Sequence, residues 1–157
     1  MKRTPTSRTE ASIIAQKRLR SAEFGSEERL QMEIVRHFAN KFPEKRGRLF
    51  ATFQNPTPEQ HGLWVSKGMV KGVADLIWID SENRIVGIEV KHPEMEHHRS
   101  TLIDQANWLI NNCHRGYFCT SVEMFWRILD GSDGIDPKKV LKYVEKMSTI
   151  KFKVLDL

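Results

Sequence analysis

Two short β-prone runs near the middle of the chain constrain its fold most strongly. They span residues 73–80 and 85–92, and the polar residues 81–84 separate them. Both runs are rich in Val and Ile, and a short polar connection between two such runs is typical of an antiparallel hairpin. An isolated hairpin is only marginally stable in water, so this one must bury its apolar side against other elements. The sequence therefore predicts a hairpin at the centre of a sheet that packs against helices.

Amphipathic patterns on both sides of the hairpin supply those helices. Ser26 is a good N-cap for a helix from Glu27 to about Lys41, and Ser100 is expected to cap a second one through Cys113. Further helices are predicted over residues 10–22, 122–129 and 137–146, further strands over 49–54, 117–120 and 150–155, and a loop over 55–58. The expected fold class is α/β (α+β), with a small central mixed sheet flanked by helices.

The 157 residues suffice for one domain, but the charge is unevenly spread along them. Residues 1–20 hold six basic groups and one acidic group, which accounts for the whole net charge of +5. We therefore expect a basic arm over residues 1–24 and a balanced domain over residues 25–157. Lys17, Arg18 and Arg20 are the arm residues most expected to meet DNA phosphates. The alternatives are a solvated terminus, or a helix over residues 10–22 buried in a dimer interface.

Other features exclude several classes of protein. No uninterrupted apolar stretch reaches the roughly 18–20 residues of a membrane span, and no apolar signal-peptide core follows the basic start. Cys113 and Cys119 suggest neither a disulfide framework nor a metal-ligand pair, so an intracellular setting is expected. The sequence has no Walker motif and no dinucleotide fingerprint, so no nucleotide cofactor is expected.

Three charged residues interrupt the apolar hairpin. Glu89 and Lys91 share one face of the second strand because strand side chains alternate, whereas Val90 points into the core. Asp75 lies across the hairpin, and two converging carboxylates make the oxygen-rich site that Mg²⁺ or Mn²⁺ prefers. A neighbouring lysine can orient an attacking water and neutralise charge on a phosphate. The alternative is a surface salt bridge between Glu89 and Lys91 on a solvated sheet face.

The wider context favours the first interpretation. Residues 72–75, followed by Glu89-Val90-Lys91 with Glu89 fourteen positions after Asp75, resemble the D…(D/E)-x-K signature of the PD-(D/E)XK nuclease superfamily. Residues 26–31 and 105–117 resemble the flanking elements of its VRR-NUC branch, so the resemblance covers about residues 26–120. Ala74 stands where that family usually has proline.

This resemblance implies a restriction-endonuclease-like fold and a metal-dependent DNA endonuclease. Small stand-alone members resemble junction resolvases, which act as homodimers on branched DNA. The resemblance also implies that Asp75, Glu89 and the backbone carbonyl of Val90 hold Mg²⁺ or Mn²⁺ and that Lys91 orients the water. Glu27 would support the metal or its waters, and Gln105 would hold Lys91 or a water.

The helical pattern alone leaves two of these assignments open. Taking about 100° per residue, Glu27 lies about 40° and Glu28 about 60° from the centre of the apolar face, and the resemblance selects Glu27. The alternative for Glu27 is a helix-start residue favoured by the helix dipole. Gln105 borders the apolar stripe of its helix, where the alternative is an amide satisfied by the backbone.

Some polar residues lie outside this constellation. Lys67 and Lys71 precede Asp75 and are candidate phosphate contacts, although a solvated loop explains them equally well. His61 is expected in the same long loop. The histidines and glutamates between residues 92 and 98 invite a zinc assignment, but their irregular spacing favours a charged loop over the active site. The rival function for the whole chain is a non-catalytic nucleic-acid- or protein-binding protein on a nuclease fold.

Overall fold

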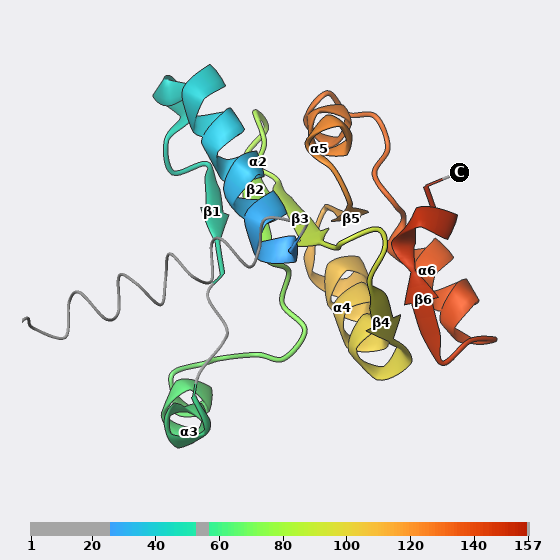
Figure 1. Cartoon of the computed structure of the whole chain (residues 1–157). Helices are drawn as coiled ribbons and strands as arrows, with labels where there is room; N and C mark the ends of the chain where they lie inside the picture. Colours follow the sequence, from blue (N-terminus) through green and yellow to red (C-terminus); the bar gives the residue numbers. More distant parts are fainter. Residues whose placement is uncertain (1–25, 53–56, 157) are drawn as a thin grey trace, which may run out of the picture.

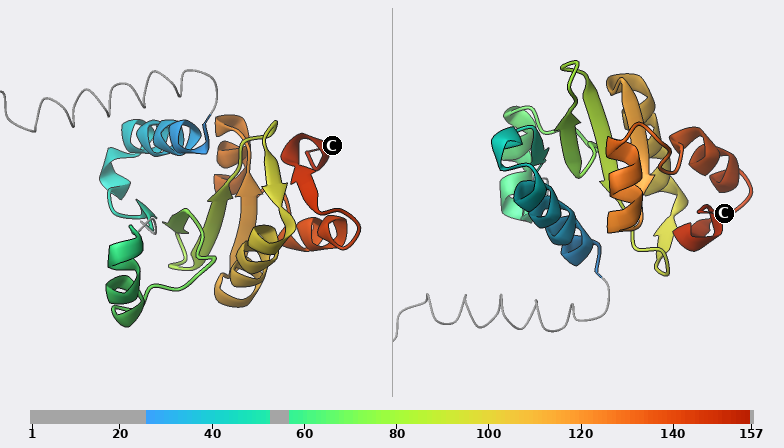
Figure 2. Two further views of the ribbon diagram at one scale, coloured as in Figure 1. Left: turned by 60° about the horizontal axis from the view of Figure 1, so that its bottom comes forward. Right: turned by 90° about the horizontal axis from the view of Figure 1, so that it is seen from above.

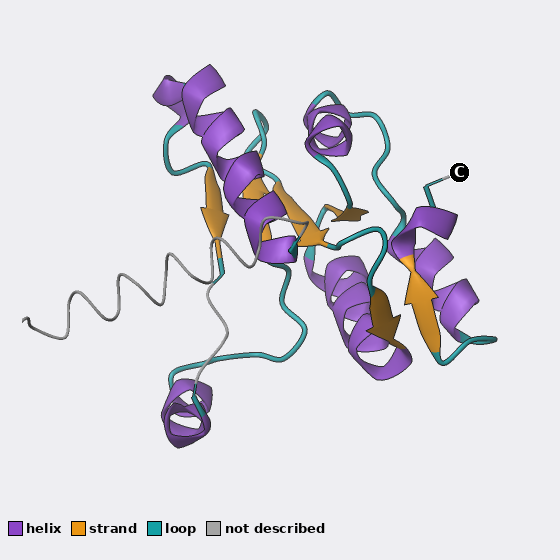
Figure 3. Cartoon of the chain, in the orientation of Figure 1, coloured by secondary structure: helices purple, strands orange, loops and turns teal. Residues whose placement is uncertain are grey.

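The chain forms a small mixed sheet flanked by helices in a computed structural model that describes residues 26–52 and 57–156 (Figures 1 and 3). The helices are α2 (Glu27–Lys41), α3 (Pro58–Ser66), α4 (Arg99–Asn112), α5 (Val122–Leu129) and α6 (Pro137–Val144), with short 3₁₀ turns η1 (Pro43–Lys45) and η2 (Phe152–Val154). The strands are β1 (Leu49–Ala51), β2 (Leu76–Ile79), β3 (Ile85–Val90), β4 (Glu96–His98), β5 (Arg115–Cys119) and β6 (Thr149–Lys151).

The main sheet has four strands in the order β1-β2-β3-β5. Strand β2 pairs antiparallel with both β1 and β3, so the predicted hairpin is confirmed. Strand β5 pairs parallel with β3, and this connection runs through β4 and α4 because parallel neighbours require a crossover. The sheet is therefore mixed, and β3 lies inside it, bonded on both edges.

Helices cover both faces of this sheet (Figure 2). Helix α2 packs on β1 and β3 and meets α5, where the rings of Phe38 and Phe125 lie 6.3 Å apart. Helix α4 packs on the other face against β3 and β5, with α6 beside it. Strand β3 is buried from Val86 to Val90, which places its side chains between the two helical layers.

A second, two-stranded sheet pairs β4 with β6 and ties the end of the chain to the loop after β3. His97 lies opposite Ile150 in this antiparallel ribbon. The ribbon leads directly into α4, which begins at Arg99, whose N–H donates to the carbonyl of Ser148 at 3.0 Å.

Several sequence predictions need correction. Helix α4 starts at Arg99, one residue before Ser100, so Ser100 does not cap it. The N-cap position is taken by His98, the last residue of β4. The predicted strand over 150–155 ends at Lys151, where the N–H of Lys153 turns to the carbonyl of Pro93. Residues 96–98 are a strand and not a loop.

The region before Asp75 also differs from the prediction. His61 lies in α3 and not in a loop, and the predicted loop over 55–58 stops where Pro58 opens this helix. No residue of α3 is buried, and Figure 1 shows the helix set apart from the sheet. Because α3 has no buried face, its sequence does not show the apolar periodicity by which a helix is predicted. Within the described residues, no helix has both the length and the apolar character needed to cross a membrane.

Candidate active site

The open end of the β2–β3 hairpin places two carboxylates side by side. The ladder begins at the pair Leu76 and Ile88, and Asp75 stands just outside it. Its Oδ2 accepts the N–H of Val90 at 2.9 Å, while its own N–H donates to Oε2 of Glu89 at 3.2 Å. Side chains therefore continue the pairing where the two backbones separate, and both carboxylates are fixed by backbone donors.

The orientation of Val90 follows from its neighbours in β3. The N–H of Lys91 donates to the carbonyl of Cys119 in β5 at 2.9 Å, so the backbone of Val90 faces the opposite edge of the strand. Its N–H indeed reaches Asp75. Because the N–H and C=O of one residue in an extended strand face the same edge, the carbonyl of Val90 also faces the side of Asp75.

Glu89 lies under α4. It shares a sheet face with Gly87, where a Cβ would meet the side chains of Cys113 and Leu109 at 2.5 and 2.7 Å, so the helix sits directly on this face. Glu89 and Lys91 are 1 % and 4 % exposed, and Lys91 Nζ lies 3.0 Å from Glu89 Oε1. The alternative of a surface salt bridge on a solvated face is therefore wrong.

Gln105 of α4 contacts the pair of Glu89 and Lys91 through the carboxylate of Glu89. Its Nε2 donates to the same Oε1 of Glu89 that receives Lys91. Its Oε1 is buried and has no hydrogen-bond partner among the described residues. The alternative of an amide satisfied by the backbone is wrong, and the unpaired acceptor is left available for a donor within the site.

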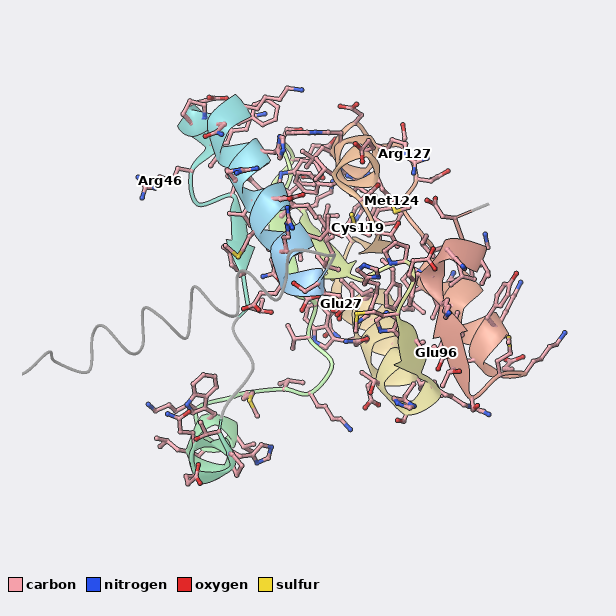
Figure 4. All side chains as sticks on the ribbon, in the orientation of Figure 1. Glu27, Arg46, Glu96, Cys119, Met124 and Arg127 are labelled. Carbon is pink, nitrogen blue, oxygen red and sulfur yellow. The ribbon has the colours of Figure 1, made fainter. Side chains whose placement is uncertain are left out.

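Glu27 enters from the opposite helical layer. Ser26 caps α2 by accepting the N–H of Arg29 at 3.1 Å, so Glu27 stands on the first turn, at the end of α2 nearest β3 (Figure 4). Its Oε1 accepts the N–H of His92 at 3.1 Å, and its Oε2 lies 3.9 Å from Lys91 Nζ. Glu28 is exposed. Of the two glutamates, Glu27 is therefore the one that contacts the cluster formed by Asp75, Glu89 and Lys91.

A glycine holds the loop before Asp75 against α4. Gly72 has φ +83°, and a Cβ there would lie 2.9 Å from the backbone carbonyl oxygen of Asp104. Both its conformation and its close approach to the helix require glycine. Lys71 pairs with Asp104 at 3.0 Å on the surface beside Gln105, whereas Lys67 is exposed at the end of α3 and does not join the cluster.

The charges of the cluster do not balance. The carboxylates of Glu27, Asp75 and Glu89 surround the single cation Lys91, which leaves two uncompensated negative charges when all of them are ionised. Burial raises the pKa of Asp75 and raises that of Glu89 to about 8. Burial by itself would lower the pKa of Lys91, but the attraction of the three carboxylates outweighs it and raises this pKa, so Lys91 stays protonated at neutral pH.

His97 is a member of the site that sequence reasoning missed. Its Nε2 lies 3.1 Å from Glu27 Oε1 and 3.3 Å from the carbonyl oxygen of His92. Burial lowers its pKa, so the ring is neutral at pH 7. No local pattern could have found it, because β4 forms only by pairing with β6, more than fifty residues later. His92 accepts the N–H of Glu94 at Nδ1, and His98 is exposed.

The cluster can be compared with the needs of a divalent metal. Within residues 26–52 and 57–156, no group of three His, Cys, Asp or Glu side chains forms a metal site by itself. The expected ligand set has only two such side chains, Asp75 and Glu89, with the Val90 carbonyl facing the same side. All three atoms are hard oxygen donors. Two uncompensated negative charges equal the charge of Mg²⁺ or Mn²⁺, so the residues fit that group.

Comparison of the chain with protein-family models, with curated proteins and with solved structures gave no match. The predicted arm over residues 1–24, with Lys17, Arg18 and Arg20, lies outside the described residues.

Proposed function

We propose that the chain is a metal-dependent DNA endonuclease of the PD-(D/E)XK type, with a restriction-endonuclease-like fold close to the VRR-NUC branch. The observation that carries the proposal is the cluster in which three carboxylates surround one lysine, with Glu89 and Lys91 buried and Glu27 and Asp75 half-buried. An acid such as Glu89, buried with its charge incompletely compensated, marks a functional site more often than a stabilising one. Asp75, Glu89 and Lys91 of this cluster are the three residues of the D…(D/E)-x-K pattern.

Each residue has a role that follows from its contacts. Asp75 and Glu89, with the Val90 carbonyl, would hold Mg²⁺ or Mn²⁺, which when bound polarises the scissile phosphodiester. Lys91 stays protonated, so it can donate hydrogen bonds to the attacking water and the phosphate but cannot act as a base. Gln105 fixes the carboxylate of Glu89 and keeps a free acceptor.

The proposed substrate is DNA with a branched or other non-uniform structure, cut by a homodimer inside the cell. The resemblance to the VRR-NUC branch, whose small members resemble junction resolvases, favours selection by DNA shape over selection by base sequence. The basic arm, with Lys17, Arg18 and Arg20, and the exposed Lys67 and Lys71 would supply phosphate contacts. Because phosphate contacts release counterions, binding should weaken steeply as salt rises.

The deciding experiment is a metal titration with a panel of linear, nicked, flap and four-way DNAs. We expect no cleavage in EDTA, cleavage with Mg²⁺ or Mn²⁺, and binding without cleavage in Ca²⁺, which takes more ligands at longer distances. A preparation of Glu89→Gln made in parallel controls for contaminating nucleases. Full activity in EDTA would overturn the metal mechanism. Binding without cleavage in every metal would favour the rival, a non-catalytic binding protein on a nuclease fold.

A further inference from the structure

Thr52 follows β1 directly and makes two hydrogen bonds to the segment that contains Asp75. Its N–H donates to the carbonyl oxygen of Asp75 at 3.0 Å, and its hydroxyl donates to the carbonyl oxygen of Ala74. Ala51 lies opposite Leu76 in the β1–β2 ladder, so Thr52 and Asp75 continue this register by one position. Thr52 is therefore bonded to the main chain on both sides of the Asp75 Cα atom.

These two bonds hold the two peptide planes that flank Asp75. The carbonyl of Ala74 and the N–H of Asp75 belong to one planar peptide unit, and the carbonyl of Asp75 belongs to the next. The orientation of each plane relative to the Cα atom determines φ and ψ of Asp75, which are the only soft torsions of its backbone. Thr52 thus fixes the direction in which the side chain of Asp75 leaves the backbone.

The first of these peptide planes also reaches Glu89. The N–H of Asp75 donates to Glu89 Oε2 at 3.2 Å. The Thr52 hydroxyl, the peptide unit and the Glu89 carboxylate therefore form a chain of hydrogen bonds, in which each bond polarises and strengthens the next. Through the backbone, Thr52 acts on both carboxylates that would hold the metal.

The backbone at Asp75 lies outside the regular strand. Strand β2 begins only at Leu76, and the turn before it contains Gly72 with φ +83°. Ala74 has no ring that would fix its φ. Because Ala74 is fully buried, its carbonyl oxygen requires a donor, and the hydroxyl of Thr52 is that donor. The hydroxyl adds a constraint that the pairing of β1 with β2 does not supply.

We propose that Thr52 is a positioning residue, which orients the carboxylate of Asp75 and the N–H that bonds Glu89 by holding the peptide planes around Asp75. This inference rests on the proposed nuclease function for its catalytic consequence. The orientation of Asp75 itself can be measured without substrate and without metal.

A matched set of variants tests this role. Thr52→Val removes the hydroxyl and keeps a branched side chain of similar shape, whereas Thr52→Ser keeps the hydroxyl. Thr149→Val, at a half-buried threonine of β6 in the second sheet, is the control for the loss of a threonine hydroxyl elsewhere. Thermal melting checks that each variant folds. If Thr52→Val does not melt cooperatively, Thr52→Ala removes the hydroxyl in its place.

The main measurement is amide hydrogen exchange in EDTA. The N–H of Val90 donates to Asp75 Oδ2, so its exchange reports on the Asp75 carboxylate and not on a bond made by Thr52. The N–H of Lys91 donates to the carbonyl of Cys119 on the other edge of β3 and is the internal reference. The ratio of the two exchange rates separates a released Asp75 from a general loss of stability, which would speed both amides.

The second measurement is Mn²⁺ binding to the protein without DNA, followed by calorimetry, and the third is steady-state cleavage with Mg²⁺. We expect Thr52→Val to raise the Val90 to Lys91 exchange ratio roughly tenfold. Mn²⁺ should bind about tenfold more weakly and kcat should fall about tenfold, as is usual when a supporting partner of a metal ligand is removed. KM for DNA should stay within about twofold. Thr52→Ser should recover most of each loss, and Thr149→Val should match the wild type.

An unchanged exchange ratio in a folded Thr52→Val protein would overturn the proposal, and so would a Thr52→Ser protein as impaired as Thr52→Val. A raised ratio with unchanged Mn²⁺ affinity and unchanged kcat would overturn its consequence for the site. If the wild-type protein cleaves no DNA in any metal, the proposed function fails. The exchange ratio then still decides whether Thr52 positions Asp75, so the two failures are distinguishable.

Discussion

The two ends of the β2–β3 hairpin shift the pKa values of their acidic side chains in opposite directions. At the turn, Asp80 is 3 % exposed and accepts the backbone N–H groups of Glu82 and Arg84, each at 2.9 Å. The guanidinium of Arg84 adds a further bond at 2.9 Å, and that of Arg115 lies 3.8 Å away. These bonds, foremost the backbone N–H of Arg84, lower the pKa of Asp80.

At the open end, the carboxylates outnumber their cation. Asp75 and Glu89 each accept one backbone N–H, and Lys91 is the single positive group among them and Glu27. Burial therefore wins over hydrogen bonding and raises both pKa values. Burial alone does not determine the protonation state of an acid, because the hydrogen-bond donors and cations around the carboxylate also shift its pKa. The turn end of the hairpin therefore contributes to stability. The open end has an excess of negative charge, which a bound cation would compensate.

The largest effect is expected when the open end loses its cation. Lys91→Ala should lower kcat by about 10³-fold or more, because it removes the group that would orient water and neutralise charge on the phosphate. DNA affinity should change little, since Lys91 would meet only the scissile phosphate, whereas the basic arm, Lys67 and Lys71 are the proposed contacts to the other phosphates. Nicking and gel-shift assays on one preparation measure both. Cleavage near the wild-type rate would contradict the role of Lys91.

A second prediction uses the pH dependence of stability without metal. Glu89 has a folded pKa of about 8, above its unfolded value, so its contribution is fully present below pH 4.5 and is lost as pH rises toward 8. The free energy of unfolding in EDTA should fall over this window by a few kcal/mol, on the order expected for a shift of this size. Urea titrations from pH 5 to 9 measure it.

Glu89→Gln should lack that decline, because the amide cannot ionise. Added Mg²⁺ should also flatten the decline in the wild type, since a cation that binds the ionised carboxylate stabilises the folded state. Identical pH profiles for the two proteins in EDTA would show that Glu89 is not the group responsible. Cleavage by Glu89→Gln should be absent at every pH.

The turn should respond in the opposite sense. Asp80→Asn removes an acid whose lowered pKa stabilises the fold above its unfolded pKa, so we expect Tm at pH 7 to fall by roughly 5 °C. Because the turn lies at the far end of the hairpin, kcat at 20 °C below Tm should stay within about twofold of the wild type. A large loss of kcat in a folded Asp80→Asn protein would break the contrast between the two ends.

The smallest loss of stability is expected for Gln105→Leu. This substitution keeps the helix and much of the volume but removes the donor to Glu89 and the unpaired buried acceptor. We expect kcat to fall about tenfold, as for a partner that orients a site residue, while Tm stays equal or rises because a buried unsatisfied oxygen is gone. Calorimetry and single-turnover cleavage test the pair of outcomes. A fall in Tm with normal cleavage would make Gln105 a packing residue.

Local patterns predicted the parts of the site that belong to single elements. Strand alternation placed Glu89 and Lys91 on one face, and Ser26 placed the start of α2 correctly. The same reasoning missed His97, misplaced His61 in a loop and could not separate Glu27 from Glu28 without the resemblance. The cases of His97 and Glu27 depend on contacts between distant segments, which a window of neighbouring residues cannot detect. The case of His61 has another cause, since α3 buries no residue.

The sequence by itself determined the hairpin, the spacing of Asp75, Glu89 and Lys91, and the helical stripes that must be buried, because these follow from the fixed periods of strands and helices. The tertiary structure decided how far each charged group is buried and which hydrogen-bond donors surround it. Helix α4 covers Glu89, and the β4–β6 ribbon carries His97 to Glu27. Burial and donor count set the pKa values, and both arise only when α2, α4 and the ribbon pack around the end of β3.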